Sequence, residues 1–230
     1  TDAERGSFAV LGSGRIGGKA SGLVQVQEML SFIFPGYRFG SYIIDIPRMI
    51  VLRTGLFRDF VRQNNLMETV ESGTGDSGIA MAFLKGEFSP VFSGDLLSLA
   101  RLAPAPLAVR SSSLLEDALS EPFAGVYLTK MIPNNQLDPF ERFRKLLEAD
   151  KLVYASTFFE EARAYAEATG KGRMEEEMAV IVQQVAGSRR GNRFYPAVSG
   201  VARSWNYYPT GNALPEEGVV NCALGLGKTI

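Results

Sequence analysis

Residues 107–128 constrain the chain more than any other stretch, because a dense polar group lies there between two short apolar runs. The runs, residues 107–109 and 126–128, each predict a β-strand. Arg110 ends the first predicted strand, and three serines follow it. A guanidinium donates a fork of N–H bonds to phosphate oxygens, and small hydroxyl residues add donors without crowding. The stretch predicts a phosphate site; residue chemistry alone leaves open a surface loop with an ordinary arginine–glutamate ion pair.

The order of residues in this stretch carries a family resemblance. Residues 109–125, VRSSSLLEDALSEPFAG, closely resemble the nucleotide-binding segment of the phosphoenolpyruvate synthase and pyruvate phosphate dikinase family, which shows Val-Arg-Ser-Ser, Glu-Asp and Phe-Ala-Gly at this spacing. The resemblance implies that Arg110 contacts the phosphates of ATP and that the serines after it shape the loop. Glu116 and Asp117 then either orient Arg110 or touch a metal through water.

A glycine-rich segment, residues 12–22, lies between an apolar run and a predicted helix. Its glycines Gly12, Gly14 and Gly17 satisfy the G-x-G-x-x-G spacing of dinucleotide-binding proteins, so a Rossmann oxidoreductase domain is one alternative. The acidic residue of that pattern would be Asp45, on a predicted strand. Asp45 lies well beyond the usual offset of about 20 residues, which argues against this alternative.

The same segment contains Gly17-Gly18-Lys19 at the predicted start of the helix. Backbone N–H groups and the helix dipole favour an anion at such a place, and the lysine adds a positive charge. A solvated lysine in a helix-entry loop is the alternative. The run Gly-Gly-Lys-Ala-x-x-Leu is similar to the opening motif of the same family, which implies that Lys19 reaches the ATP phosphates.

Composition excludes several classes of function. The formal net charge of −1 leaves no broad basic face for nucleic acid, and no apolar run approaches the roughly 18 residues of a membrane span. The chain has no histidine, which excludes Ser-His-Asp and Cys-His catalysis and imidazole zinc sites. Its single cysteine, Cys222, favours a reducing, cytoplasmic location. The chain begins without methionine and ends in a predicted loop, so we expect a fragment.

Helical periodicity dominates the middle of the chain and strands dominate its end, which favours an α+β fold. We expect two subdomains, residues 1–105 with the Gly-Gly-Lys loop and residues 106–230, the second incomplete at its C-terminus. Asp76 is expected to cap its helix. The predicted helices are residues 23–30, 56–61, 76–86, 90–103, 138–147 and 152–169. The predicted strands are residues 8–11, 42–45, 107–109, 126–128, 178–186, 194–205 and 219–224.

The final third also resembles the family. Residues 178–185 look like the strand that runs beside the nucleotide, residues 199–201 like a Ser-Gly-Val strand, and residues 223–227 like a Gly-Leu-Gly loop. The family loop continues with a glutamate that helps to hold Mg²⁺, whereas this chain has Lys228. Because a lysine cannot ligate a hard cation, Lys228 either pairs directly with phosphate or marks altered phosphoryl transfer. Arg203 stands where the family prefers an aromatic residue.

The resemblance implies an ATP-grasp-like nucleotide-binding domain with ATP and Mg²⁺ as cofactors. In the full enzymes this domain passes phosphate from ATP to a histidine on another domain, and the phosphate then reaches pyruvate or a related acceptor. A non-catalytic nucleotide-sensing or interaction module on the same fold is the alternative, motivated by Lys228. Lys19 and Arg110 are the expected catalytic residues. The expected nucleotide-contacting residues are Lys19, Arg110, Ser111, Ser112, Gln183, Gln184, Gly225, Gly227 and Lys228.

Overall fold

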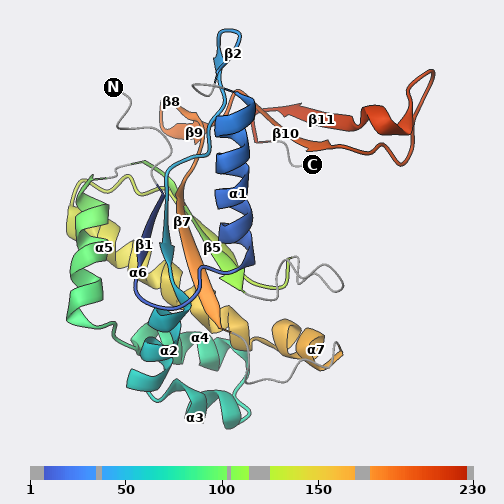
Figure 1. The fold of residues 1–230 in the computed structure, drawn as a ribbon. Coiled ribbons are helices and arrows are strands. Elements are labelled where there is room, and N and C mark those ends of the chain that lie inside the picture. Colours follow the sequence, from blue (N-terminus) through green and yellow to red (C-terminus); the bar gives the residue numbers. More distant parts are fainter. Residues whose placement is uncertain (1–7, 35–37, 103–104, 114–124, 169–176, 227–230) are drawn as a thin grey trace. The chain divides into compact units, whose positions relative to one another are not determined.

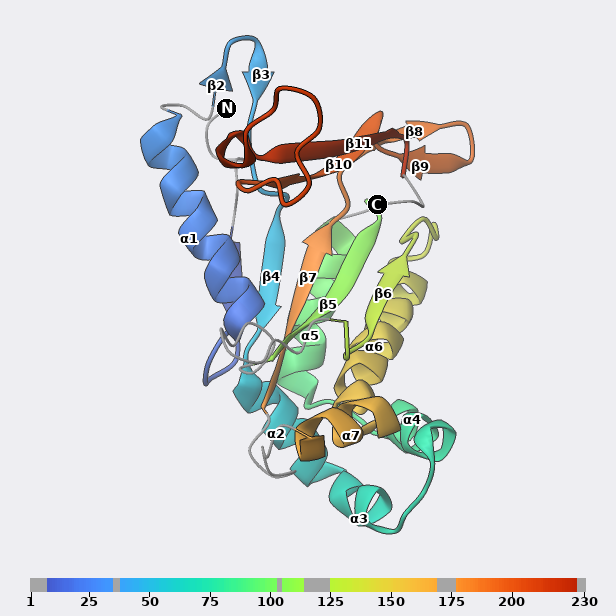
Figure 2. The same ribbon diagram turned by 90° about the vertical axis from the view of Figure 1, so that its right-hand side faces the viewer.

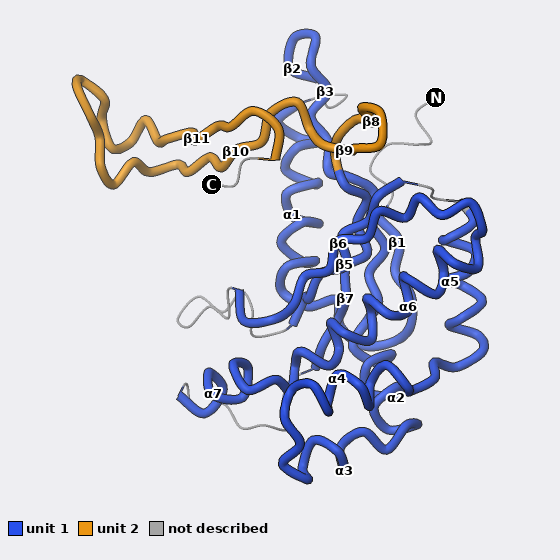
Figure 3. Tube along the Cα trace, turned by 180° about the vertical axis from the view of Figure 1, so that it is seen from behind, with its two compact units in different colours: residues 1–185 blue, residues 186–230 orange. Residues whose placement is uncertain are grey.

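The computed structural model forms two compact units, residues 1–185 and residues 186–230 (Figures 1 and 3). Helices and strands both build the chain, in agreement with the mixed α and β class expected. Strands from both sides of residue 105 share a sheet in the first unit. The subdomain boundary that we expected at this residue stays a prediction. The structure describes residues 8–34, 38–102, 105–113, 125–168 and 177–226.

The first unit contains a five-stranded sheet with the order β1-β4-β7-β5-β6. Its strands are β1 (Phe8–Leu11), β4 (Met49–Leu52), β7 (Met178–Gln184), β5 (Leu107–Ser113) and β6 (Thr129–Ile132). β1 is parallel to β4, and β7 is antiparallel to both β4 and β5. The carboxyl ends of β1, β4 and β5 therefore meet at one edge of the sheet, where β7 begins. We call this edge the carboxyl edge.

The central strand β7 explains why the sheet is buried on both faces. Six of its seven residues, MAVIVQ, are buried, as expected for a strand covered by helices on both sides. Alternation sends Val180 and Val182 into one core, and Ala179 and Ile181 into another.

The larger core lies between one face of the sheet and a layer of helices (Figure 2). Aromatic rings fill it: the ring centroids of Phe60 and Phe88 lie 4.4 Å apart, and those of Phe57 and Tyr154 lie 5.1 Å apart. The elements that contribute to this core are α2 (Thr54–Gln63), α3 (Leu66–Glu71), α4 (Asp76–Lys85), α5 (Pro90–Leu102), α6 (Pro139–Ala155), the 3-10 turn Ser156–Phe158 and α7 (Glu160–Ala168).

Helix α1 (Gly18–Ile33) covers the opposite face of the sheet (Figure 1). Its Ala20 is buried against Val51 and Ile181 of the sheet, and Leu23 and Leu30 pack beside them. Other large apolar side chains of α1, including Phe32 and Ile33, are exposed. A short hairpin of β2 (Arg38–Phe39) and β3 (Tyr42–Ile43) follows the helix.

The second unit consists of two antiparallel ribbons. β8 (Ser188–Arg190) pairs with β9 (Arg193–Tyr195), and β10 (Val198–Arg203) pairs with β11 (Val219–Leu224). A 3-10 turn at Pro215–Glu217 precedes β11. Within residues 186–226 every residue is exposed or only half-buried. Two-stranded ribbons are marginally stable by themselves, and these described residues form no apolar core of their own.

Several strand predictions were wrong in their bounds. The strand expected at residues 42–45 is only the exposed pair Tyr42–Ile43. The strand that joins β1 is β4, whose apolar run MIVL is buried except for the half-buried Ile50. The strand expected at residues 126–128 begins later, at Thr129. The strand expected at residues 194–205 divides into β9 and β10, with Pro196 between them.

Two helix predictions were wrong as well. Asp76 does not cap α4, whose N-cap is Gly75; its carboxylate instead accepts a hydrogen bond of 2.8 Å from the backbone N–H of Glu160, the first residue of α7. The helix expected at residues 152–169 is in fact the end of α6, a 3-10 turn and the separate helix α7.

Candidate functional site

Two loops at the carboxyl edge are tied together by backbone hydrogen bonds. The glycine-rich loop leaves β1 and leads to α1, and a short link joins β4 to α2. The N–H of Gly55 donates to the carbonyl of Ser13 at 2.9 Å, and the N–H of Thr54 donates to the carbonyl of Arg15 at 3.0 Å. In return, the N–H of Arg15 donates to the hydroxyl of Thr54 at 3.1 Å. The glycine-rich loop is therefore held firmly beside the start of α2.

The start of α1 is fastened to strand β5 by Ser112. The Ser112 hydroxyl accepts a hydrogen bond of 3.0 Å from the N–H of Ala20 and donates one of 3.0 Å to the carbonyl of Ile16. Gly17, with a φ of +78°, lies directly against this strand, and a Cβ at its position would overlap the Ser112 carbonyl. Glycine is therefore required there both by its backbone conformation and by lack of space.

Lys19 lies in the first turn of α1 and extends to β5. Its ammonium group donates to the backbone carbonyl of Ser111 at 3.3 Å, and the Ser111 hydroxyl lies 3.5 Å from it. These contacts join positions 92 residues apart in the sequence. They place the lysine beside the strand residue that immediately follows Arg110.

Arg110 is not at the end of a strand, as the sequence suggested, but inside β5, which continues through the three buried serines. Its register partner on β7 is Ile181, so its side chain lies on the face that α1 covers. One guanidinium N–H donates to the side-chain carbonyl of Gln183 at 3.2 Å. The Gln183 amide in turn lies 3.5 Å from the carbonyl of Pro47. Gln183 thereby orients Arg110, and its neutral amide does not compensate the charge of the guanidinium.

The other predicted site residues lie in different places. Gln184 follows Gln183 on β7, so alternation directs its side chain to the opposite face of the sheet. Gly225 directly follows β11 in the second unit. Gly227, Lys228, Glu116 and Asp117 lie outside the described residues. Lys19, Arg110, Ser111, Ser112 and Gln183 are thus the predicted residues that the first unit brings close to one another. Gln183 pairs with Met49, the first residue of β4, and therefore lies toward the edge opposite the carboxyl edge.

Arg53 is a further cation at this edge that sequence reasoning missed. It stands between β4 and α2, and its backbone N–H donates to the carbonyl of Leu11 at 3.0 Å. Because β4 was not recognised as a strand, nothing in the sequence indicated that the residue after it would lie at the same edge as the glycine-rich loop.

The described residues offer no ready set of ligands for Mg²⁺. No group of three or more histidine, cysteine, aspartate or glutamate side chains gathers anywhere in the described ranges. Hard cations need several oxygen ligands, and the described part of the site supplies mainly cations and hydroxyls. This donor set suits an anion such as a phosphate.

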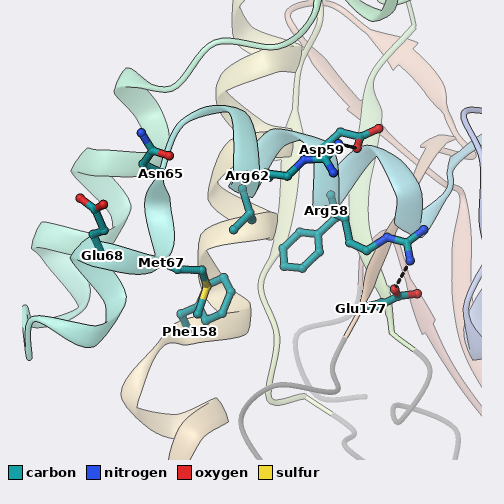
Figure 4. A pocket seen from close by; sticks show the side chains of 10 residues that line it. Arg58, Asp59, Arg62, Asn65, Met67, Glu68, Phe158 and Glu177 are labelled. Carbon is teal, nitrogen blue, oxygen red and sulfur yellow. Dashed lines mark hydrogen bonds and ion pairs between the residues drawn. The ribbon is translucent and has the colours of Figure 1, made fainter.

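A separate surface pocket of about 710 Å³ lies between α2, α3 and the 3-10 turn (Figure 4). Its floor is apolar, with Phe158 and Met67 side by side, and on its rim Arg58 pairs with Glu177 at 2.9 Å. None of the predicted site residues lines it. It is therefore distinct from the group around Lys19 and Arg110.

The comparison that decides the family is a sequence profile. The profile described as "Pyruvate phosphate dikinase, AMP/ATP-binding domain" matches residues 13–230.

The chain belongs to this family.

Its match begins within the glycine-rich loop and includes every predicted site residue, and the expected resemblance is confirmed. Among curated proteins, none matches the chain. None of the described helices has the length and apolar content needed to cross a bilayer.

Membership in the pyruvate phosphate dikinase AMP/ATP-binding family also weighs against the oxidoreductase alternative. Asp45, the acidic residue which that alternative required, lies outside any strand, and its carboxylate accepts a hydrogen bond of 2.8 Å from the N–H of the next residue, Ile46. Gly17 instead allows close packing of α1 on β5, and Gly12 and Gly14 lie against residues at the start of α2.

Proposed function

We propose that this chain is an ATP-grasp-like domain that binds ATP with its phosphates on the α1 face of the sheet. The observation that carries the proposal is the contact of Lys19 with β5 beside Arg110, because it brings two cations from distant parts of the chain to one face of one sheet. Convergent cations near a helix N-terminus are the usual equipment for binding a triphosphate.

Each residue of the first unit has a separate role in this proposal. Lys19 supplies a point charge to the phosphates, and Arg110, oriented by Gln183, supplies a planar fork of donors. Ser112 fixes the start of α1, which sets the position of Lys19. The contacts of Gly225, Gly227 and Lys228 with the nucleotide, which the family resemblance implies, stay a prediction.

In the complete protein, we propose, phosphate passes from ATP to a histidine on another domain and then to pyruvate or a related acceptor. Partner domains that carry the histidine and bind pyruvate would belong to the same longer, cytoplasmic protein. Phosphoryl transfer depends mainly on positioning and on neutralising charge, which Lys19 and Arg110 are suited to do. Mg²⁺ is proposed to accompany ATP, as the family resemblance implies, and the residues that would hold it stay a prediction.

A nucleotide-sensing or interaction module on the same fold is the second candidate. It is favoured by Lys228, which stands where the family has a metal-binding glutamate. Such a module would bind ATP through the same cations and would not transfer its phosphate.

Titration calorimetry with ATP, AMP and NAD, each with and without Mg²⁺, tests ATP binding. We expect ATP to bind and Arg110→Ala to weaken it by about tenfold or more, since a charge-assisted hydrogen bond contributes about 1.5–3 kcal/mol. NAD binding without ATP binding would rule out both candidates. Phosphate exchange in the full-length protein then separates the enzyme from the sensor.

Arg144→Ala is the matched control. Arg144 lies on α6, which follows the end of β6 at the opposite edge of the sheet, and its side chain is 65% exposed. It forms a long ion pair, a contact of 4.0 Å with Glu141. Loss of ATP affinity in this variant would show that the effect of Arg110→Ala is not specific to the site.

A further inference from the structure

The side chain of Arg53 has a buried donor without an acceptor in the described ranges of the chain. It is half-buried, and its Nε is fully buried with no hydrogen-bond partner among the described residues. Two other arginines do have partners: Arg58 pairs with Glu177, and Arg142 donates to three backbone carbonyls. A buried N–H without an acceptor costs free energy, so an acceptor from outside would relieve that cost.

The position of Arg53 joins it to the glycine-rich loop. Its backbone N–H donates to Leu11, the last residue of β1, and Thr54 next to it holds Arg15 by two hydrogen bonds. Arg163 on α7 also has a buried Nε without a partner, but no hydrogen bond connects Arg163 with the loop in the described part of the chain. The orphaned donor of Arg53 is therefore located at the loop that leads to Lys19.

The register of the sheet places Arg53 on the same face as Arg110. Along β4, Met49 and Val51 point toward α1, and the extended backbone of Arg53 continues this alternation. Val51 and Arg110 are both register partners of Ile181, from opposite sides of β7. Arg53 therefore follows β4 on the α1 face, at the level where Ser112 fastens the start of that helix.

We infer that Arg53 is a third cation of the nucleotide site and binds phosphate oxygens of ATP through its buried Nε–H. This inference rests on the proposed function and names a contact for it that no motif indicated. The orphaned N–H fits a phosphate because an anionic oxygen is the strongest acceptor that it could meet. A neighbouring carboxylate, which would compete for the guanidinium, is lacking among the described residues.

Two measurements on Arg53→Met test the inference: the dissociation constant for ATP and the melting temperature without ATP. We expect ATP to bind about tenfold more weakly or worse, because the charged donor is lost. We expect the melting temperature without ATP to be unchanged or higher, because a buried donor without an acceptor has been removed. Arg144→Met is the matched control and should change neither quantity.

The outcomes separate a binding role from a structural one. Unchanged ATP affinity in Arg53→Met would overturn the inference while leaving the proposed function intact. Weaker binding together with a lower melting temperature without ATP would also overturn it, because Arg53 would then support the fold. If the unaltered chain binds no ATP, the proposed function itself is wrong and the inference is wrong with it.

Should Arg53→Met fail to fold, Arg53→Lys serves as the second variant. It keeps the charge and loses the planar fork and the Nε donor. We expect a smaller but measurable loss of ATP affinity with no loss of thermal stability. ATP affinity equal to that of the unaltered chain would overturn the inference.

Discussion

Asp150 is a carboxylic acid buried in the larger apolar core. Its side chain is fully buried on α6, and neither of its oxygens has a hydrogen-bond partner within the described residues. Burial raises the pKa of Asp150 well above its usual value, so the neutral acid is favoured. Tyr154 lies one turn later, and burial, with a smaller effect of Asp150, raises the pKa of its phenol. One residue thereby makes the stability of the fold dependent on pH.

The sign of this dependence follows from the direction of the shift. The pKa of Asp150 is higher in the folded than in the unfolded chain, so the folded state binds more protons between the two values. The contribution of Asp150 to stability is therefore fully present below about pH 4, the pKa of an unfolded aspartate, and is lost as the pH rises toward the folded pKa.

We predict that Asp150→Asn removes this loss of folding stability at higher pH. The unaltered chain should become less stable as the pH rises above about 4, relative to the variant, and the variant should be the more stable at neutral pH. Urea unfolding at a series of pH values measures both slopes. Parallel curves of stability against pH for the two proteins would show that the pKa of Asp150 is the same in the folded and the unfolded chain.

At the scale of single residues, sequence reasoning found part of the candidate site. Lys19 and Arg110 were indicated by motifs, and Gln183 was named together with Gln184 because no pattern distinguished the two. The choice depends on strand alternation, which directs only Gln183 toward Arg110. Arg53 was missed because its significance arises from a donor left without a partner among the described residues, which no sequence pattern can indicate.

At the scale of elements, the junction of α1 with β5 decides where Lys19 lies. This junction depends on one residue without a side chain, Gly17, which packs on the backbone of Ser112. Periodicity predicted α1 correctly but ended the strand at Val109, because the polar run of serines does not look like a buried strand. Pairing with β7 extends β5 through Ser113, an effect of tertiary structure that a local pattern cannot contain.

We predict that Gly17→Ala destabilises the chain by at least about 2 kcal/mol, because a Cβ would overlap the Ser112 carbonyl and strain a backbone with positive φ. Gly22→Ala is the matched control: it lies within the same helix, and a Cβ added there would have no atom within 4 Å. Since alanine favours a helix over glycine by about 1 kcal/mol, the control should be neutral or stabilising. Thermal or urea unfolding measures both, and equal effects would contradict the prediction.

At the scale of the whole molecule, the two units differ in how much they bury. The first unit, residues 1–185, has two apolar cores, and described residues of the second unit, 186–226, include none that is buried. The sequence predicted the strands of the second unit from their apolar residues. It did not indicate that ribbon β10–β11 would leave Val220 and Leu224 largely exposed, because alternation alone does not show whether a partner covers a face.

We predict that the two units differ in hydrogen exchange. Amides of β5 and β7 should exchange slowly, because their opening requires unfolding of the sheet, whereas amides of β10 and β11 should exchange orders of magnitude faster. Exchange followed by mass spectrometry on the isolated chain measures this difference. Equal protection in the two units would show that the ribbons are stabilised by contacts beyond their own pairing.

The middle strand of the sheet is also the last of its strands along the chain. β7 lies between β4 and β5, although β4 ends at Leu52 and β7 begins only at Met178. During synthesis on the ribosome, the edges of β4 and β5 that pair with β7 stay unpaired until the segment around Ile181 emerges. Translation pauses or truncations before that point would expose those edges to chaperones and to aggregation.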